Sequence, residues 1–227
     1  MMGTLGAAGF CSGLALVGIF LVTEPRIERN RAEALEAAIY RVLPGARSRQ
    51  AFVVREGRLT PFVSPGGTLP REAAVYAGYD AEGTPLGFAI PAEGPGFQDT
   101  IKLIYGYDPA RRRVVGMEVL ESKETPGLGD KIYKDADFVA NFRDLAIDPE
   151  VVLARKGRVG ENEVDAISGA TISSRAVVRI INGGNGRWLE RLTLPPPAPP
   201  ATPSAEVAPS AEGPPSGSRA AVEEDAS

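Results

Sequence analysis

The chain opens with a long uncharged apolar run. Residues 3–23 contain no charged side chain. At ~1.5 Å rise per residue, a helix of this length is about 30 Å long, which matches the hydrocarbon layer of a bilayer. The pattern predicts a transmembrane anchor over residues 1–23. A cleaved signal peptide is the alternative, although no basic segment precedes the run and no clear small-residue cleavage site closes it.

A helical repeat follows the apolar run. Apolar residues recur at helical spacing between Ile27 and Leu43. Pro25 stands just before them, at a position that the first turn of a helix favours, and Pro44-Gly45 ends the pattern. We therefore expect a helical stalk over residues 24–45 that begins at Pro25.

Short alternating segments then indicate a sheet. Apolar and polar residues alternate in six of them, and turn residues separate them. They cover residues 51–55, 58–63, 73–79, 85–90, 101–107 and 113–121. Helical patterns follow at residues 133–142 and 172–181, and the glycines of residues 183–186 predict a break in the last helix. The predicted fold class is α+β, with a mainly antiparallel sheet and flanking helices over residues 46–194.

The composition changes again after residue 194. Nine prolines fall between Pro195 and Pro215, mixed with Ala, Ser and Glu. Such a stretch buries too little apolar surface to order itself, so residues 195–227 are predicted to be a disordered tail.

Charge and residue counts exclude several classes of site. The chain has one Cys and no His, which excludes an internal disulfide, an iron–sulfur cluster, a zinc site of the usual type and His-based catalysis. The formal net charge is −4, all of it contributed by the tail, so no basic patch supports nucleic-acid binding. If the protein carries electrons, an organic cofactor must do so.

The first candidate site is the segment Asp165-Ala166-Ile167-Ser168-Gly169-Ala170-Thr171, which leads into the last predicted helix. Gly169 allows an unusual φ, and the start of the helix offers free N–H groups and partial positive charge. A phosphate is favoured there, with the Thr171 hydroxyl beside it. On local grounds alone, an ordinary helix cap also explains the segment.

The second candidate site is the segment at residues 121–131, which follows a predicted strand and contains Glu124-Thr125-Pro126-Gly127-Leu128-Gly129. Its proline and glycines predict a tight turn with exposed backbone, which a flat ring can approach. An ordinary strand-to-helix turn is again the local alternative.

Together the two motifs resemble one family. Asp165-x-x-Ser168-Gly169-Ala170-Thr171 is similar to the flavinylation motif of the FMN-binding domains in Rnf and Na⁺-pumping NADH:quinone reductase complexes, and residues 124–129 are similar to their second signature. The runs from Gly106 and Gly116 are similar as well. The whole arrangement most resembles the G subunit of the Rnf complex.

The resemblance implies a covalent cofactor. FMN would be joined to Thr171 by a phosphoester bond, made by a separate flavin transferase that uses FAD and recognises Asp165 and residues 168–171. Helix-terminal N–H groups near residues 168–173 would hold the phosphate. Around the motif, the implied cofactor-binding residues are Thr171, Asp165, Ser168, Gly169, Ala170 and Ser173. In the second loop they are Thr125, Gly127, Leu128 and Gly129 near the ring, with Glu124 orienting the loop.

The resemblance also implies a role. The chain would be an electron-relay subunit of a membrane-bound ferredoxin:NAD⁺ oxidoreductase, with no catalytic residue of its own. Its partners would be the other subunits of the complex, in the bacterial inner membrane, with the flavin domain outside the cytoplasm. The alternatives are the C subunit of the Na⁺-pumping reductase, a stand-alone tethered flavin reductase, or an anchored binding or scaffold protein that has no flavin.

Overall fold

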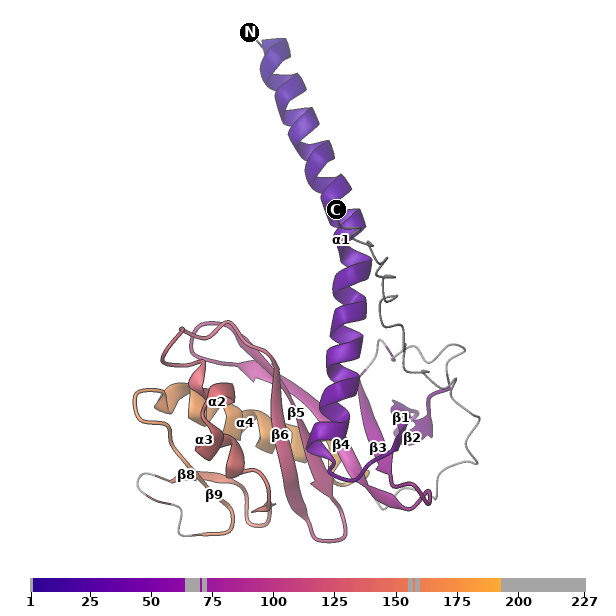
Figure 1. Cartoon of the computed structure of the whole chain (residues 1–227), viewed down its shortest axis with the longest axis vertical. Coiled ribbons are helices and arrows are strands. Elements are labelled where there is room, and N and C mark those ends of the chain that lie inside the picture. The colour runs from indigo at the N-terminus through magenta and orange to yellow at the C-terminus, as the bar shows by residue number, and fades with distance from the viewer. Residues whose placement is uncertain (1, 64–69, 71–72, 155–156, 158–159, 193–227) are drawn as a thin grey trace, which may run out of the picture.

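The computed structural model describes residues 2–63, 70, 73–154, 157 and 160–192. The predicted tail over residues 195–227 lies outside this range. Figure 1 shows a twisted sheet with a long helix projecting from one face and a second helix lying across the other.

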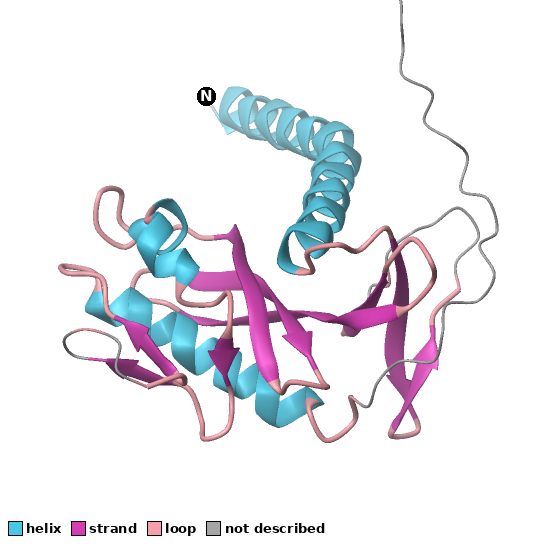
Figure 2. Cartoon of the chain, turned by 60° about the horizontal axis from the view of Figure 1, so that its bottom comes forward, coloured by secondary structure: helices cyan, strands magenta, loops and turns pink. Residues whose placement is uncertain are grey.

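One continuous helix, α1 (Met2–Val42), covers the region where an anchor and a separate stalk are predicted. Pro25 lies inside this helix, so the prediction that a helix begins at Pro25 is wrong. A proline inside a helix removes one backbone hydrogen bond and crowds the carbonyl group four residues earlier. Solvent surrounds α1 at this point, and Figure 2 shows the helix bent partway along, a common response to a proline. The helix therefore continues past Pro25.

Among the described residues, no helix has both the length and the apolar character needed to cross a membrane. The anchor predicted for residues 1–23 is not confirmed by this criterion.

Within the described part of the chain, seven strands form one sheet in the order β2-β1-β3-β4-β5-β6-β7, with every neighbouring pair antiparallel. The strands are β1 (Ser48–Arg55), β2 (Arg58–Pro61), β3 (Ala74–Tyr79), β4 (Pro85–Pro95), β5 (Thr100–Asp108), β6 (Arg113–Glu121) and β7 (Leu145–Ala146). The mainly antiparallel sheet with flanking helices is confirmed. A separate parallel pair, β8 (Val152–Ala154) and β9 (Glu163–Asp165), was not predicted, because strands this short show no alternation.

Alternation along the strands divides the core between two faces of the sheet. In β5, Leu103, Tyr105 and Tyr107 belong to the larger cluster, while Ile104 points to the smaller one. The larger cluster includes the buried side of α4 (Thr171–Trp188), and the smaller one includes Ile39 and Val42 at the end of α1. The end of α1 therefore packs on one face of the sheet, and α4 packs on the other together with buried residues of the short helical segment at 131–140.

Two glycines allow α1 to end directly on the sheet. Gly106 and Gly116 are cross-strand partners in β5 and β6. A Cβ at Gly116 would lie 3.0 Å from the Val42 carbonyl oxygen, and one at Gly106 would collide with the same atom. Arg41 also donates two hydrogen bonds of 2.6 Å to the carboxylate of Glu118 on β6. The family-like runs at Gly106 and Gly116 therefore form a seat for α1.

Two short helices, α2 (Lys131–Lys134) and α3 (Ala136–Ala140), replace the single helix predicted over residues 133–142. Asp135 separates them in an extended conformation and caps α3, because its side chain accepts hydrogen bonds from the N–H groups of Asp137 and Phe138. The capping aspartate thus divides the apolar pattern.

Helix α4 runs unbroken to Trp188, so the break predicted at residues 183–186 is wrong. A Cβ at Gly184 would lie 2.5 Å from the Tyr105 hydroxyl oxygen, so a glycine lets the helix approach this buried ring. The Tyr105 hydroxyl donates a 2.9 Å hydrogen bond to Asn185, and burial raises its pKa. Tertiary packing therefore outweighs the low helix propensity of glycine.

Candidate functional site

The site begins where β9 ends and the chain turns into α4. Gly169 adopts a φ of +83°, which favours glycine, and Ala170 precedes the helix. Ser174 fastens this turn, because its hydroxyl accepts from the Ile167 N–H (3.2 Å) and donates to the Ala170 carbonyl (3.0 Å). Thr171 is exposed at the first position of the helix.

The start of α4 has properties that suit an anion. The N-cap residue is Ala170, whose side chain has no acceptor for the first-turn N–H groups. These groups therefore point out of the helix end without a side-chain cap, where the helix dipole favours negative charge. A phosphoryl group on Thr171 would lie beside this end.

The second loop is as tight as its sequence predicts. Gly127 has a φ of +77°, and the Thr125 carbonyl accepts from the N–H groups of Leu128 (3.2 Å) and Asp130 (3.3 Å). Leu128 remains 49% exposed, although it is a large apolar side chain. Its Cδ2 lies 3.7 Å from where a Cβ on Gly169 would be, so the tips of the two motifs lie side by side.

The buried side chain of Glu124 connects the two motifs. Its buried carboxylate accepts hydrogen bonds from the backbone N–H groups of Phe97 and Gln98 (2.9 Å each) and from the Ser173 hydroxyl (2.5 Å). Burial alone would raise the pKa of Glu124, but the hydrogen bonds from Ser173 and the two backbone groups outweigh burial and lower it. The carboxylate therefore stays ionised while it holds the loop at 96–98, its own loop and the first turn of α4 together.

Glycine makes this close packing possible. A Cβ at Gly129 would lie 2.7 Å from Glu124 Oε2 and 3.0 Å from the Ser173 hydroxyl oxygen. A Cβ at Gly96 would collide with Glu124 Oε1. Gly129 thus leaves room for Glu124.

The structure brings most of the predicted site residues together. Glu124, Gly129 and Ser173 are in mutual contact, and Leu128 lies beside Gly169. The Thr125 hydroxyl donates a hydrogen bond of 3.1 Å to the side chain of Gln98.

Asp165 and Ser168 line a different pocket from the one that Thr171 lines. They line a cavity of about 320 Å³ next to α3, where the Asp165 N–H donates to Asn141 Oδ1 (3.2 Å). The buried Oδ1 of Asp165 has no hydrogen-bond partner among the described residues.

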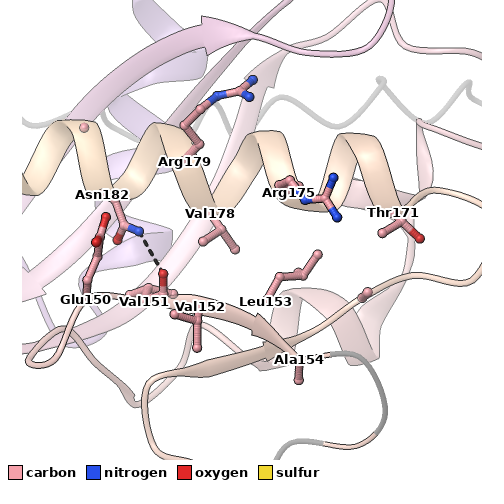
Figure 3. Close-up of a pocket in the computed structure, with 12 residues that line it drawn as sticks. Glu150, Val151, Val152, Leu153, Ala154, Thr171, Arg175, Val178, Arg179 and Asn182 are labelled. Carbon is pink, nitrogen blue, oxygen red and sulfur yellow. Dashed lines mark hydrogen bonds between the residues drawn. The ribbon is translucent and has the colours of Figure 1, made fainter.

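Thr171 lines a larger pocket of about 760 Å³, between α4 and β8 (Figure 3). Arg175, Val178 and Asn182 line it from α4, and residues 150–154 line it from the opposite side. The Asn182 amide donates to the Val151 carbonyl (2.8 Å), which fixes one end of the pocket. This volume is within the usual range for small-molecule sites.

Several residues of the site were not predicted. Phe97 and Gln98 gave no local signal, because they lie 27 and 26 residues before Glu124. Ser174 and Arg175 were detectable in principle, since residues three and four positions after Thr171 share its side of a helix.

The residues present fit an FMN. A hydroxyl and a helix end without a side-chain cap are available for its phosphate, and exposed Leu128 with glycine backbone is available for an apolar ring. A roomy pocket starts at the same hydroxyl.

Comparison with known proteins agrees with this fit. Residues 96–184 match the FMN-binding domain family, and they include both motifs. The G subunit of the ion-translocating oxidoreductase complex of Methanosarcina acetivorans is 38% identical over 103 residues, which are 45% of this chain and 52% of that protein. The chain therefore spans about half the length of that relative.

Longer alignments cover other proteins of the same name. The G subunit of Shewanella piezotolerans is 27% identical over 75% of this chain and 79% of its own, and that of Pectobacterium atrosepticum is 29% identical over 78% and 81%. The resemblance that the two motifs indicate is confirmed.

Two solved structures share the fold. NqrC of Shewanella oneidensis has a TM-score of 0.56 at 16% identity, over 71% of this chain and 97% of its own. The C subunit of the Na⁺-translocating NADH-quinone reductase from Parabacteroides distasonis has a TM-score of 0.56 at 19% identity, over 74% and 96%. At these identities the likeness concerns the fold alone.

Proposed function

We propose that this chain, whose residues 96–184 match the FMN-binding domain family and resemble the G subunits of ion-translocating oxidoreductases, carries FMN on Thr171 and relays electrons within such a complex. The observation that carries the proposal is the exposed Thr171 hydroxyl at a helix end without a side-chain cap, beside the second motif. Bound FMN supplies the redox chemistry, and the protein positions it.

Attachment requires a hydroxyl that a separate enzyme can reach. Thr171 Oγ forms a bond to the flavin-side phosphorus of FAD, the bond from that phosphorus to the AMP oxygen breaks, and AMP leaves. The hydroxyl proton passes to the flavin transferase or to water. The position of Thr171 on an exposed first turn supports access, and the first-turn N–H groups stabilise the negative charge that remains on the phosphodiester.

The second loop has two distinct tasks in this proposal. Gly127, Leu128 and Gly129 offer backbone and one apolar side chain to the ring, with Thr125 at the start of the turn. The Ser173 hydroxyl donates to the carboxylate of Glu124, so these two side chains hold the loop against α4. Asp165, Ser168 and Ala170 shape the turn that the transferase recognises.

The partners follow from the relatives. Proteins named as subunits of an ion-translocating complex support a role beside other subunits at the bacterial inner membrane. We propose that the uncharged residues 3–23 attach the chain to that membrane, with the flavin domain on the extracytoplasmic side. Co-purification with other subunits distinguishes this role from a stand-alone reductase. The identity of those subunits also distinguishes it from the C subunit of the Na⁺-pumping reductase, whose known structures share the fold.

Intact mass measures the central claim directly. Co-expressed with a flavin transferase, the full chain should gain the mass of one FMN minus water, and the denatured protein should remain yellow and fluorescent. Thr171→Ala should abolish the gain, while Thr171→Ser should keep it, because only the hydroxyl oxygen enters the linkage. A wild-type protein that stays colourless and unmodified would refute the function.

A further inference from the structure

We propose that Arg175 is a positioning residue that pairs with the phosphoryl group on Thr171 and holds it on the α4–β8 side of the helix. This inference rests on the proposed function and adds a residue that neither motif contains. It starts from spacing: Thr171, Arg175, Val178 and Asn182 stand at i, i+4, i+7 and i+11, which is one stripe of a helix. All four line the same pocket.

The direction of the side chain agrees with the spacing. In Figure 3 the guanidinium group of Arg175 lies along α4 toward Thr171, while Arg179 extends from the side of α4 opposite Leu153. A guanidinium offers several N–H donors in a planar fork, which matches two oxygens of a phosphoryl group. The Arg175 side chain is thus aimed at the place where a phosphate on Thr171 would be.

Arg175 is also the available cation of this pocket. The second arginine, Arg179, donates a 2.5 Å hydrogen bond to the Pro95 carbonyl. Among the described residues, Arg175 forms neither a hydrogen bond nor an ion pair. The acidic residue of the pocket lining, Glu150, lies at the Asn182 end, away from Thr171 (Figure 3).

A cation is needed here because a carboxylate from another loop is already hydrogen-bonded to the first turn of α4. Glu124 binds Ser173 at 2.5 Å and stays ionised, so a negative charge sits near the helix end before any phosphate arrives. A phosphodiester on Thr171 adds a second negative charge, and like charges this close repel each other. Ser173, which binds Glu124, is buried, while Thr171 is exposed. The carboxylate of Glu124 and a phosphodiester on Thr171 would therefore lie on different sides of α4. Arg175 attracts the phosphodiester to the side away from Glu124.

The test measures both attachment and the environment of the phosphorus. The full chain is co-expressed with a flavin transferase as wild type, Arg175→Gln and Arg175→Lys, with Arg187→Gln as the matched control on the same helix. Loading is followed by intact mass, and the phosphodiester of loaded protein by its ³¹P resonance. We expect Arg175→Gln to load about tenfold more slowly, the effect of losing one charge-assisted hydrogen bond. Its ³¹P resonance should shift, with the Lys variant intermediate and Arg187→Gln unchanged.

Each other outcome has a defined meaning. Wild-type loading and an unchanged ³¹P resonance in Arg175→Gln overturn the role of Arg175, and so does an equal effect of Arg187→Gln. Loss of loading in both the Gln and the Lys variant, at wild-type melting temperature, assigns Arg175 to recognition by the transferase and likewise overturns the phosphate role. An unmodified wild-type chain overturns the proposed function itself, so the two failures are distinguishable.

Discussion

Glu124 illustrates how a single side chain organises a site that two motifs share. Its carboxylate lies at the meeting point of three segments and accepts hydrogen bonds from two of them, while its own loop supplies Gly129 as the surface against which it packs. Polar groups buried in this way are costly when a partner is removed, because the remaining donors lose their acceptor. Glu124 is thus a structural centre of the site.

Acid should weaken the fold through Glu124. Its lowered pKa means that the folded state binds the proton less tightly than the unfolded state, so the ionised group stabilises the fold above the unfolded value of about 4.3. That stabilisation is lost as the pH falls from about 4.3 through the lowered pKa of the folded state. Urea unfolding of wild type and Glu124→Gln across this range should show a smaller loss of stability with acid in the variant.

The exposed turn residue Glu82 provides the control for this measurement. Glu82→Gln should leave the dependence of stability on pH as in wild type, since no bond of the Glu82 side chain holds distant segments together. Identical pH dependence in wild type and Glu124→Gln would contradict the assigned role of Glu124. At neutral pH, Glu124→Ala should cost about 1–3 kcal/mol, because the Ser173 hydroxyl and two N–H groups lose their acceptor.

At the scale of elements, the alternation of apolar and polar residues predicted the strands correctly, whereas the glycines of residues 183–186 wrongly predicted a break in α4. The six alternating segments correspond to β1–β6, whose buried side chains are divided between the two core clusters on opposite faces of the sheet. The strands β7, β8 and β9 have two or three residues each and are fixed by distant partners, so no local pattern marks them.

The candidate site likewise has a part that local sequence predicts and a part that depends on distant contacts. Both motifs are local in sequence, and their turns have the glycine conformations that the residues indicate. What joins them is the bond between Glu124 and Ser173, 49 residues apart, and the contact of Glu124 with the loop at 96–98. Such contacts depend on how β4, β5 and α4 pack, so the sequence alone could not supply them.

The glycines of α4 offer a matched pair for testing tertiary packing against helix propensity. Gly184→Ala should destabilise the protein by about 1–3 kcal/mol, because the new methyl group meets the buried Tyr105 ring. Gly186→Ala should stabilise it by about 0.5–1 kcal/mol, because a Cβ there meets open space and alanine favours the helix. Thermal and urea unfolding of the two variants measure the difference.

Opposite signs for the two substitutions are the decisive result. Stabilisation by Gly184→Ala as large as that by Gly186→Ala would show that the approach of α4 to Tyr105 is looser than the structure indicates.

For the whole molecule, the arrangement of the two helices matters most. The end of α1 packs on one face of the sheet, and α4, which begins with Thr171, packs on the other (Figure 1). The seat formed by Gly106 and Gly116, together with the ion pair between Arg41 and Glu118, fixes α1 to β5 and β6. The candidate site and the end of the long helix are therefore joined through the sheet.

A larger side chain at Gly106 or Gly116 should displace the end of α1 from the sheet. Gly106→Ala should lower the melting temperature and increase hydrogen exchange over residues 35–43, because the methyl group would collide with the Val42 carbonyl. Gly116→Ala should have the same effect to a smaller degree, since its Cβ would lie 3.0 Å from that oxygen. Exchange that stays at the wild-type level in both variants would show that the glycine seat does not control docking.

Because the end of α1 is attached to the sheet, a change of angle within α1 would move the whole globular part of the chain. Pro25 precedes the seated residue Val42 by 17 positions, which at ~1.5 Å per residue makes a lever arm of about 25 Å. With the lower end of the helix fixed to the sheet, a swing of about 20° at the proline carries the whole globular head through roughly 9 Å. In the proposed role, in which the chain accepts an electron from one neighbour and passes it to another, the distance that the flavin domain can cover depends on how far the helix swings at Pro25.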